Sequence, residues 1–268
     1  PKEIRLDWAT YNPVSLVLKE KGFMDQALAA DGIAVRWVFS AGSNKALEFL
    51  NAGSLDFGST AGAAALVAKI NGNPLNSIYV YSRPEWTALV APKDSKIASV
   101  ADLKGQRVAV TRGTDPHIFL VRALAGAGLS EKDVKLVLLQ HADGLFFRKP
   151  EANTWGVLNV RTEFAKENPE LTRKVLGVYD KARQWALANM GELKSMMMAA
   201  TKLSDAVIAR QLERTDMSSG LIGAAQAATI AEAGKALQAA GVLDGGIAID
   251  NVVAGMIDPS FAKAALGA

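Results

Sequence analysis

The chain has 268 residues, of which 50% are hydrophobic and 21% are charged, and this composition excludes a wholly disordered protein. It contains no cysteine and two histidines, which excludes thiolate-bound zinc, iron–sulfur clusters, a thiol nucleophile and disulfides. The net charge of +3 comes from scattered basic residues, which do not indicate nucleic-acid binding. No apolar run reaches about 18 residues, so a membrane-spanning helix is excluded.

The first part of the chain alternates β-rich runs with segments of helical spacing. Strands are predicted at Ile4–Trp8, Ala34–Phe39, Phe57–Ser59 and Ser77–Tyr81, and helices at Val14–Lys21, Asn44–Ala52 and Ala63–Asn71. This alternation is typical of βαβ units and predicts a mostly parallel sheet. Ligands of such sheets bind at the carboxyl ends of the strands.

A second set of elements begins after Trp86. Strands are predicted at Thr87–Ala91, Arg107–Val110, Lys135–Leu139 and Trp155–Arg161, helices at Val100–Lys104 and Pro116–Ala127, and only helices thereafter. We therefore predict an α/β fold of two lobes with a ligand cleft between them. In this prediction residues 1–86 form the first lobe, residues 87–161 the second, and residues 162–268 are helices that return to pack on the first lobe.

The alternation of elements fails after His141-Ala-Asp-Gly144, because Leu145-Phe-Phe147 follows at once with the character of another strand. A crossover between parallel strands needs about a dozen residues or more. We therefore expect that residues are missing between Gly144 and Leu145, on the order of twenty by the length of a βαβ unit.

Small polar residues follow several of the predicted strands. Ser40-Ala-Gly-Ser43-Asn44, Thr60-Ala-Gly62 and Thr111-Arg-Gly-Thr-Asp115 each lie where a helix begins, and Tyr11-Asn12 follows the first strand. Such residues commonly serve only as helix caps. Three helix starts that face one cleft also suit an anion, which free N–H groups and the helix dipole would hold.

Other candidate residues carry a structural and a functional interpretation side by side. Arg83 and Arg112 lie next to strand ends, where either could bind an anion. Alternatively, Arg83 could pair with Glu85 and Arg112 could be solvated. His117 could donate into the cleft or cover its helix start, and one histidine without a second ligand does not indicate a metal. Trp155, which follows Asn153 and Thr154, could form an apolar wall for a ligand or belong to the core.

Catalytic signatures are absent from the sequence: there is no Gly-x-Ser-x-Gly elbow, no phosphate-binding lysine loop and no His-Glu-x-x-His helix. We therefore do not expect an enzyme or a cofactor. The first residues already have the pattern of a strand and no signal peptide is visible, so the protein is either cytosolic or has lost its targeting segment.

Two long runs resemble a known family. Ser40–Pro74 (SAGSNKALEFLNAGSLDFGSTAGAAALVAKINGNP) and Tyr79–Leu124, which includes ADLKGQRVAV before a Gly-Thr helix start, are similar to the nitrate/sulfonate/taurine group of ABC-importer substrate-binding proteins, most of all to alkanesulfonate-binding proteins. The resemblance implies a periplasmic, type II binding-protein fold, monomeric, whose two lobes close on a ligand and deliver it to a membrane permease. Relatives have a further helix and strand after the HADG phrase, which this chain lacks.

The resemblance, together with the strand-end residues, predicts the ligand site. The predicted residues are Tyr11, Asn12, Gly42, Ser43, Asn44, Ala61, Gly62, Arg83, Thr111, Gly113, Thr114, Asp115, Asn153 and Trp155. A sulfonate is fully ionised and accepts hydrogen bonds without donating any, which suits loops rich in hydroxyl and N–H donors.

Other ligands and functions remain open from the sequence. The same fold could bind nitrate, taurine or another small organic anion. It could also be an enzyme like those that make the thiamine pyrimidine, although these depend on a cysteine-rich motif, or the sensing half of a transcription regulator, which would need a helix-turn-helix domain.

Overall fold

The computed structural model describes residues 1–92, 94–110, 112–138 and 153–268. Thr111 and the expected gap at Gly144–Leu145 lie outside these ranges. The strands are β1 (Glu3–Trp8), β2 (Ala34–Phe39), β3 (Phe57–Ala61), β4 (Leu75–Pro84), β5 (Arg107–Val110), β6 (Lys135–Leu138), β7 (Gly156–Arg161) and β8 (Thr215–Asp216). The α-helices are α1 (Pro13–Glu20), α2 (Phe23–Ala29), α3 (Ser43–Asn51), α4 (Gly62–Ile70), α5 (Asp115–Gly126), α6 (Thr162–Glu167), α7 (Pro169–Ala188), α8 (Met190–Thr201), α9 (Asp205–Glu213), α10 (Ala224–Ala239), α11 (Ile249–Met256) and α12 (Ser260–Leu266).

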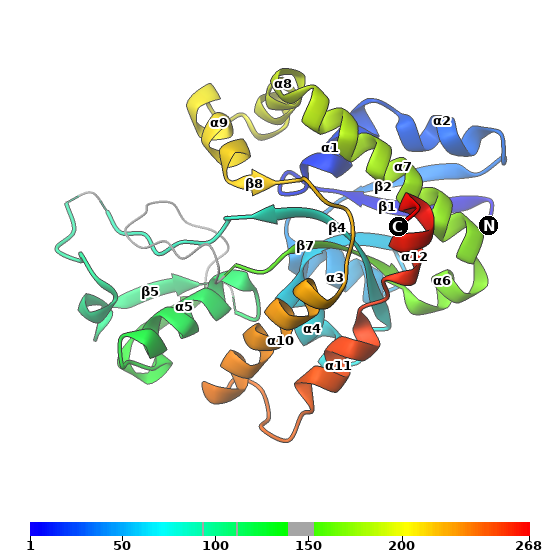
Figure 1. Ribbon diagram of the computed structural model, residues 1–268. Helices are drawn as coiled ribbons and strands as arrows, with labels where there is room; N and C mark the ends of the chain where they lie inside the picture. The colour runs from blue at the N-terminus through cyan, green and yellow to red at the C-terminus, as the bar shows by residue number, and fades with distance from the viewer. Residues whose placement is uncertain (93, 111, 139–152) are drawn as a thin grey trace.

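The strands form two sheets of unequal size, which belong to two lobes (Figure 1). The large sheet has the order β2-β1-β3-β7-β4-β8, and the small sheet pairs β5 with β6 in parallel. β1 is parallel to both β2 and β3, whereas β7 runs antiparallel to β3 and to β4, and β8 runs antiparallel to β4. The expectation of mostly parallel sheets therefore fails for one half of the large sheet.

The antiparallel half has a simple cause: β7 returns from the second lobe and enters the large sheet between β3 and β4. Trp155–Arg161 was assigned to the second lobe, but Gly156–Arg161 are strand residues of the first lobe. The chain thus crosses between the lobes twice, once after β4 and once before β7.

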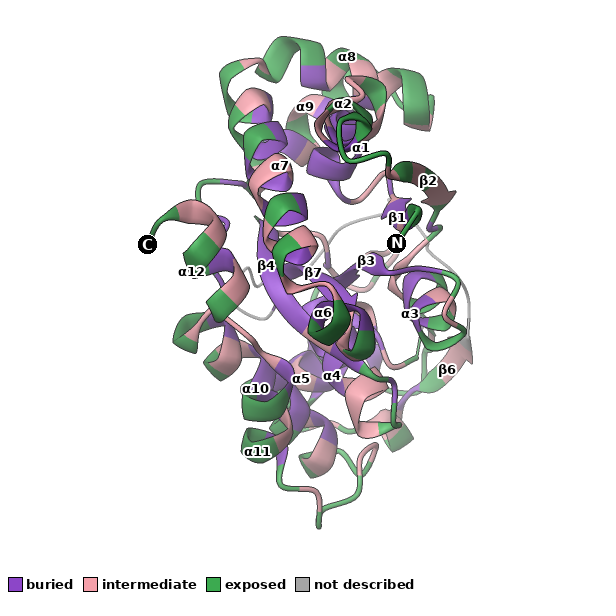
Figure 2. Ribbon diagram, turned by 90° about the vertical axis from the view of Figure 1, so that its right-hand side faces the viewer, coloured by how far each residue is buried: buried purple, intermediate pink, exposed green. Residues whose placement is uncertain are grey.

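Helices cover both faces of the large sheet, whose central strands β4 and β7 are buried (Figure 2). Side chains alternate over Tyr79–Tyr81 of β4, as the twofold period of a strand requires. Tyr79 and Tyr81 of β4 pack with α1 and α7, whereas Val80 faces the opposite side with α4, α10 and α11. Each face of the sheet therefore carries its own apolar core.

A buried carboxylate fixes the register of three strands. Asp56, directly before β3, is 1% exposed and accepts from Arg5 of β1 at 2.8 Å and from Arg161 of β7 at 2.9 Å. Hydrogen bonds to charged groups are stronger than neutral ones, and a buried pair loses most if one partner is removed. This cluster ties the returning strand to the first strands of the lobe.

The lobes also share a small apolar cluster. Ala63 of α4 packs with Ile118 of α5 and with Ala233 and Leu237 of α10, and all four are fully or almost fully buried. α10 contacts both α4 and α5. The helices after residue 161 therefore pack on both lobes, and not on the first lobe alone.

Gly62, at the start of α4, allows this close packing. A Cβ atom there would lie 2.6 Å from Cδ1 and 2.7 Å from Cγ1 of Ile230 in α10. Protein interiors have no room for such an overlap, so a larger residue forces side chains or backbone to move.

We expect Gly62→Ala to lower the free energy of unfolding by about 1–3 kcal/mol, because the added methyl overpacks the contact with Ile230. In the background of Ile230→Ala, where the obstructing atoms are gone, the same substitution should cost less. A double-mutant cycle by urea denaturation measures the difference. Additive effects would show that Ile230 does not restrict Gly62.

Candidate functional site

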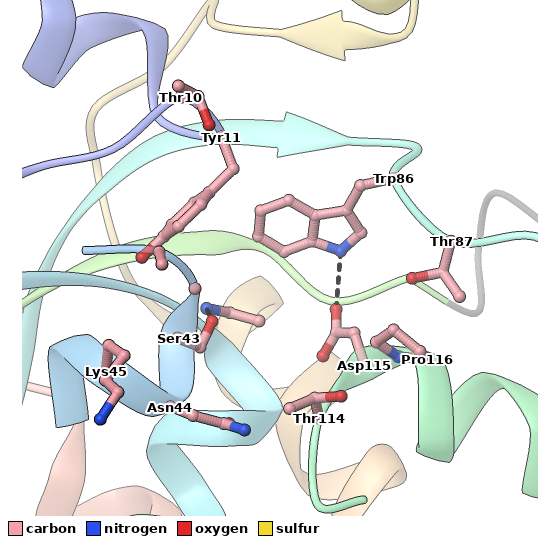
Figure 3. Close-up of a pocket in the computed structure, with 13 residues that line it drawn as sticks. Thr10, Tyr11, Ser43, Asn44, Lys45, Trp86, Thr87, Thr114, Asp115 and Pro116 are labelled. Atoms are coloured by element: carbon pink, nitrogen blue, oxygen red, sulfur yellow. Dashed lines mark hydrogen bonds between the residues drawn. The ribbon is translucent and has the colours of Figure 1, made fainter. Parts of the chain in front are cut away.

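A pocket of about 270 Å³ lies between the two lobes, at the carboxyl ends of β1 and β3 (Figure 3). Its walls come from the turn before α1, the start of α3, the end of β3, the crossing segment after β4 and the start of α5. The lining residues are Thr10, Tyr11, Ala41, Gly42, Ser43, Asn44, Lys45, Ala61, Trp86, Thr87, Thr114, Asp115 and Pro116. Both lobes and one crossing segment thus contribute to a single pocket.

The structure brings only part of the predicted site to this pocket. Seven predicted residues line it: Tyr11, Gly42, Ser43, Asn44, Ala61, Thr114 and Asp115. Six others do not belong to the lining, namely Asn12, Gly62, Arg83, Gly113, Asn153 and Trp155. Six lining residues were not predicted from the sequence, and most of them are direct neighbours of predicted ones: Thr10, Ala41, Lys45, Trp86, Thr87 and Pro116.

The start of α3 supplies uncommitted donors to the pocket. Gly42 is the N-cap, and its carbonyl accepts from the N–H groups of Lys45 and Ala46 at 3.0 and 3.2 Å. The first N–H groups of any helix lack an intrahelical acceptor, and those of Ser43 and Asn44 have none elsewhere among the described residues. The Ser43 hydroxyl accepts from the N–H of Ala61 at 3.0 Å, which holds the two strand-end loops together.

The other two helix starts offer fewer free N–H groups than α3, because those of α4 have acceptors in the protein and the second residue of α5 is a proline. In α4 the N–H of Gly62 donates to the carbonyl of Trp155 at 2.8 Å, and the N–H of Ala63 donates to the Thr154 hydroxyl at 3.2 Å. In α5 Pro116 has no N–H, and that of His117 donates to the Thr114 carbonyl at 3.0 Å. The expectation of three equivalent anion-binding helix starts is therefore wrong for α4, where both N–H groups already have acceptors.

Asp115 lines the pocket, yet its carboxylate accepts hydrogen bonds from both crossing segments. Oδ2 accepts from Nε1 of Trp86 at 2.9 Å (Figure 3). It also accepts from the N–H of Thr154 at 3.0 Å, and the Thr154 hydroxyl lies 2.7 Å from both carboxylate oxygens. Burial raises the pKa of Asp115, while the hydrogen bonds from Thr154 and Trp86 act in the opposite direction. Its oxygens therefore take donors from the protein itself.

Thr87 is a buried pocket residue with an unsatisfied hydroxyl. It is 6% exposed, and its Oγ1 has no hydrogen-bond partner in the part of the chain that the structure describes. Its N–H donates to Oδ1 of Asn153 at 2.8 Å, so Asn153 orients the crossing segment and stays outside the pocket lining. A buried hydroxyl without a partner is costly, and proteins leave few of them unsatisfied.

Asn12 serves a structural purpose that differs from its predicted one. It is fully buried and caps α1 by accepting from the N–H of Ser15 at 3.1 Å. Its Nδ2 donates to the Ser59 hydroxyl at 2.7 Å and to the Tyr179 hydroxyl at 3.0 Å. All its polar atoms therefore have hydrogen-bond partners within the protein, so none is available to a ligand.

The same network includes a buried acid. Asp7 of β1 is 1% exposed and accepts from the N–H of Ser59 at 2.9 Å and from its hydroxyl at 2.8 Å. Burial raises the pKa of Asp7 from 3.8 to about 6, against the opposing effect of the Ser59 hydrogen bonds. The Ser59 carbonyl in turn accepts from the hydroxyl of the pocket residue Tyr11 at 2.8 Å.

Arg83, Gly113 and His117 each have a contact that explains their positions. Arg83 is exposed and its guanidinium lies 5.0 Å from the ring centre of Trp155, a cation–π contact on the crossing segments. His117 is fully buried; its Nδ1 accepts from the N–H of Gly113 at 3.2 Å, and its Nε2 lies 2.6 Å from Glu131. Of the two interpretations of His117, donation into the cleft and cover of the helix start, the structure supports the second.

No group of three or more His, Asp or Glu side chains within the described ranges could hold a metal ion. None of the described helices is both long enough and apolar enough to cross a membrane.

Sequence comparison places the chain near sulfonate-binding proteins. A family model described as NMT1/THI5 like matches residues 14–146, just under half of the chain. A protein named as an aliphatic sulfonates-binding protein of Escherichia coli (strain K12) is 34% identical over 125 residues, which cover 46% of this chain and 39% of that protein. Its counterpart in Bacillus subtilis (strain 168) is 24% identical over 247 residues, which cover 80% and 74%. The match thus spans less than half of the first relative and about three quarters of the second.

Solved structures show the fold. The alkanesulfonate-binding protein of Xanthomonas axonopodis pv. citri, bound to MOPS, superposes with a TM-score of 0.83 at 20% identity and covers 96% of this chain and 98% of that one. The periplasmic aliphatic sulphonate binding protein of Escherichia coli gives 0.76 at 22% identity, with 93% and 91% covered. A desulfurization enzyme shares the fold at 13% identity and a TM-score of 0.71, with 99% of both chains covered.

These matches show the fold of the chain and the proteins that it resembles. The chain has the two-lobed α/β fold of periplasmic binding proteins, as the sequence analysis predicted. The resemblance to the sulfonate group of ABC-importer substrate-binding proteins is likewise confirmed.

Stability should depend on pH through Asp7, whose pKa of about 6 in the folded protein exceeds its value of 3.8 in the unfolded chain. The folded state then holds the proton more tightly, so the contribution of this group is fully present below pH 3.8 and is lost as the pH rises through 6. The loss amounts to about 3 kcal/mol, because one pKa unit corresponds to about 1.4 kcal/mol.

Asp7→Asn, which cannot ionise, isolates this effect from the other carboxylates. Between pH 3.5 and pH 8 the unfolding free energy of the variant should rise relative to that of the wild type by this amount, measured by urea denaturation at both pH values. A difference between the two proteins that does not vary with pH would contradict the raised pKa of Asp7.

Arg83→Ala should leave ligand affinity within about twofold of the wild type, because Arg83 is absent from the pocket lining. Loss of the contact with Trp155 should lower the unfolding free energy by about 0.5–1 kcal/mol. Calorimetric titration and denaturation measure the two quantities. A tenfold loss of affinity would place Arg83 in contact with the ligand after all.

Proposed function

We propose that this protein is the solute-binding component of an ABC importer and that it binds a sulfonate in the pocket between its lobes. The observation that carries the proposal is a donor-rich pocket whose one lining carboxylate, that of Asp115, is already occupied by Trp86 and Thr154. A sulfonate accepts hydrogen bonds at all three oxygens and stays ionised, so it needs donors and no basic partner.

The head group has identifiable donors. The N–H groups of Ser43 and Asn44 lie at the positive end of the α3 dipole, and Thr87, whose hydroxyl is buried, lines the same pocket from the crossing segment after β4. Lys45 adds a positive charge to the lining, although its ammonium also lies 2.6 Å from Glu48. The half-buried Trp86 and the small side chains of Ala41 and Ala61 give the rest of the pocket an apolar character suited to a tail.

The other ligands considered from the sequence fit this pocket less well. Nitrate has no tail to cover the apolar lining. The ammonium group of taurine needs an acceptor, and the oxygens of Asp115 already accept from the protein. A sulfonate with an apolar tail uses both ends of the pocket.

The remaining features follow from the class of protein. The relatives are named as binding proteins and the solved Escherichia coli structure as periplasmic, which supports a periplasmic location and delivery of the ligand to a membrane permease. We propose no reaction, because the described pocket brings together no nucleophile with a base, and we propose a monomer that needs no cofactor.

Thr87→Val tests the head-group donors. The substitution removes the hydroxyl and keeps the shape, so affinity for pentanesulfonate should fall about tenfold to a hundredfold, the value of a hydrogen bond to a charged group. Stability without ligand should not decrease, because the hydroxyl has no hydrogen-bond partner among the described residues. Thr87→Ser, which keeps the hydroxyl, should bind almost like the wild type.

Isothermal titration with pentanesulfonate, taurine and nitrate, together with thermal unfolding, provides both measurements. Unchanged affinity of Thr87→Val would remove Thr87 from the site. Absence of binding to any sulfonate, with binding of nitrate or taurine, would refute the proposed ligand class.

A further inference from the structure

Two aromatic rings form a corner of the pocket. Tyr11 and Trp86 both line it, with ring centres 6.4 Å apart and planes at 74° to one another. Figure 3 shows the two rings on the same side of the pocket, across from Asn44 and Thr114. Their faces are close to perpendicular, so a third group in the corner meets the face of one ring and the edge or face of the other.

Both rings are held in place by their own polar atoms. The indole Nε1 donates to Asp115 at 2.9 Å, and the Tyr11 hydroxyl donates to the Ser59 carbonyl at 2.8 Å. Burial raises the pKa of Tyr11 well above its usual value, so the hydroxyl keeps its proton for this bond. The donors of the corner are thus directed at the protein, and what it offers a ligand is carbon surface and π-electron density.

Fixed rings favour a particular kind of tail. Aromatic groups gain attraction from stacked and edge-to-face contacts beyond the area that they bury, and an alkyl group of the same size gains only the area. Rings that are already oriented lose little conformational freedom when the ligand arrives. The pocket of about 270 Å³ has room for a single six-membered ring beside the head group.

We infer that the corner formed by Tyr11 and Trp86 makes this protein select sulfonates with an aromatic tail over saturated sulfonates of the same size. This inference rests on the proposed function, since it assigns the tail of a ligand whose head group binds at α3 and Thr87.

The test compares benzenesulfonate with cyclohexanesulfonate, which have the same number of carbon atoms and the same head group. Burial of apolar area alone favours the saturated ring, which is the more hydrophobic of the two. We expect benzenesulfonate to bind about tenfold more tightly by isothermal titration, because the aromatic contacts outweigh this difference. The sign of the preference therefore separates ring contacts from simple burial.

Two variants of Trp86 locate the preference. Trp86→Phe and Trp86→Leu both lose the N–H that donates to Asp115, and they differ only in keeping or losing a ring. We expect Trp86→Phe to retain most of the preference for benzenesulfonate. In Trp86→Leu the ratio of the two dissociation constants should fall below about threefold, with Tyr11 as the remaining ring.

The outcomes are distinct. If both sulfonates bind with equal affinity, or if cyclohexanesulfonate binds more tightly, the inference fails and the proposed function stands. If neither sulfonate binds, as judged also by the absence of a shift in melting temperature, both fail. A preference for benzenesulfonate that persists unchanged in Trp86→Leu would show that the corner is not its source.

Discussion

The carboxylate of Asp115 is the junction on which the pocket depends. It stands at the start of α5 in the second lobe and accepts from one residue of each crossing segment, Trp86 after β4 and Thr154 before β7. The Thr154 hydroxyl also accepts from the N–H of Ala63, so the junction reaches α4 of the first lobe. A buried carboxylate needs such donors, because the cost of leaving one unpaired is several times that of a neutral group.

One consequence is electrostatic. An acid beside an anion-binding pocket would repel the ligand if its charge faced the cavity. Here hydrogen bonds from the protein and the positive end of the α5 dipole offset part of that charge, and burial still raises the pKa of Asp115. The junction therefore supports a crossing point between lobes and leaves the neighbouring donors available to an anion.

Local chemistry made most of the elements around the pocket predictable. The strand Arg107–Val110 has its predicted bounds, and α3 begins at Ser43, one residue before the predicted start, because strand propensity and capping residues are properties of short segments. The polar residues at strand ends, together with the family resemblance, also predicted seven of the residues that line the pocket. Its interpretation as a ligand site remains the proposal argued above.

The predictions that failed have one cause in common, which is that the positions concerned depend on contacts between distant segments. Gly62 and Asn12 have the residue types of a ligand site, yet their donors meet Trp155 and Ser59, which no local pattern places beside them. Trp86 and Thr87 were not predicted as pocket residues, because they lie in a segment that leaves the sheet. Such a segment has no hydrophobic periodicity from which the side that faces the pocket could be predicted. The direction of β7 escaped prediction because strand order and direction depend on the whole chain.

The uneven commitment of the three helix starts sets the polarity of the pocket. The first N–H groups of α4 donate to the crossing segment before β7. α5 begins with an acid followed by a proline. In contrast, the first turn of α3 has two N–H groups without acceptors in the described structure. Under the proposed function, the negative charge of a ligand is therefore best placed at the α3 end, while Tyr11 and Trp86, whose polar atoms are directed into the protein, are suited to an uncharged tail. Similar residue types at three strand ends thus lead to three different outcomes, and the difference lies in which distant donors and acceptors the fold brings to each.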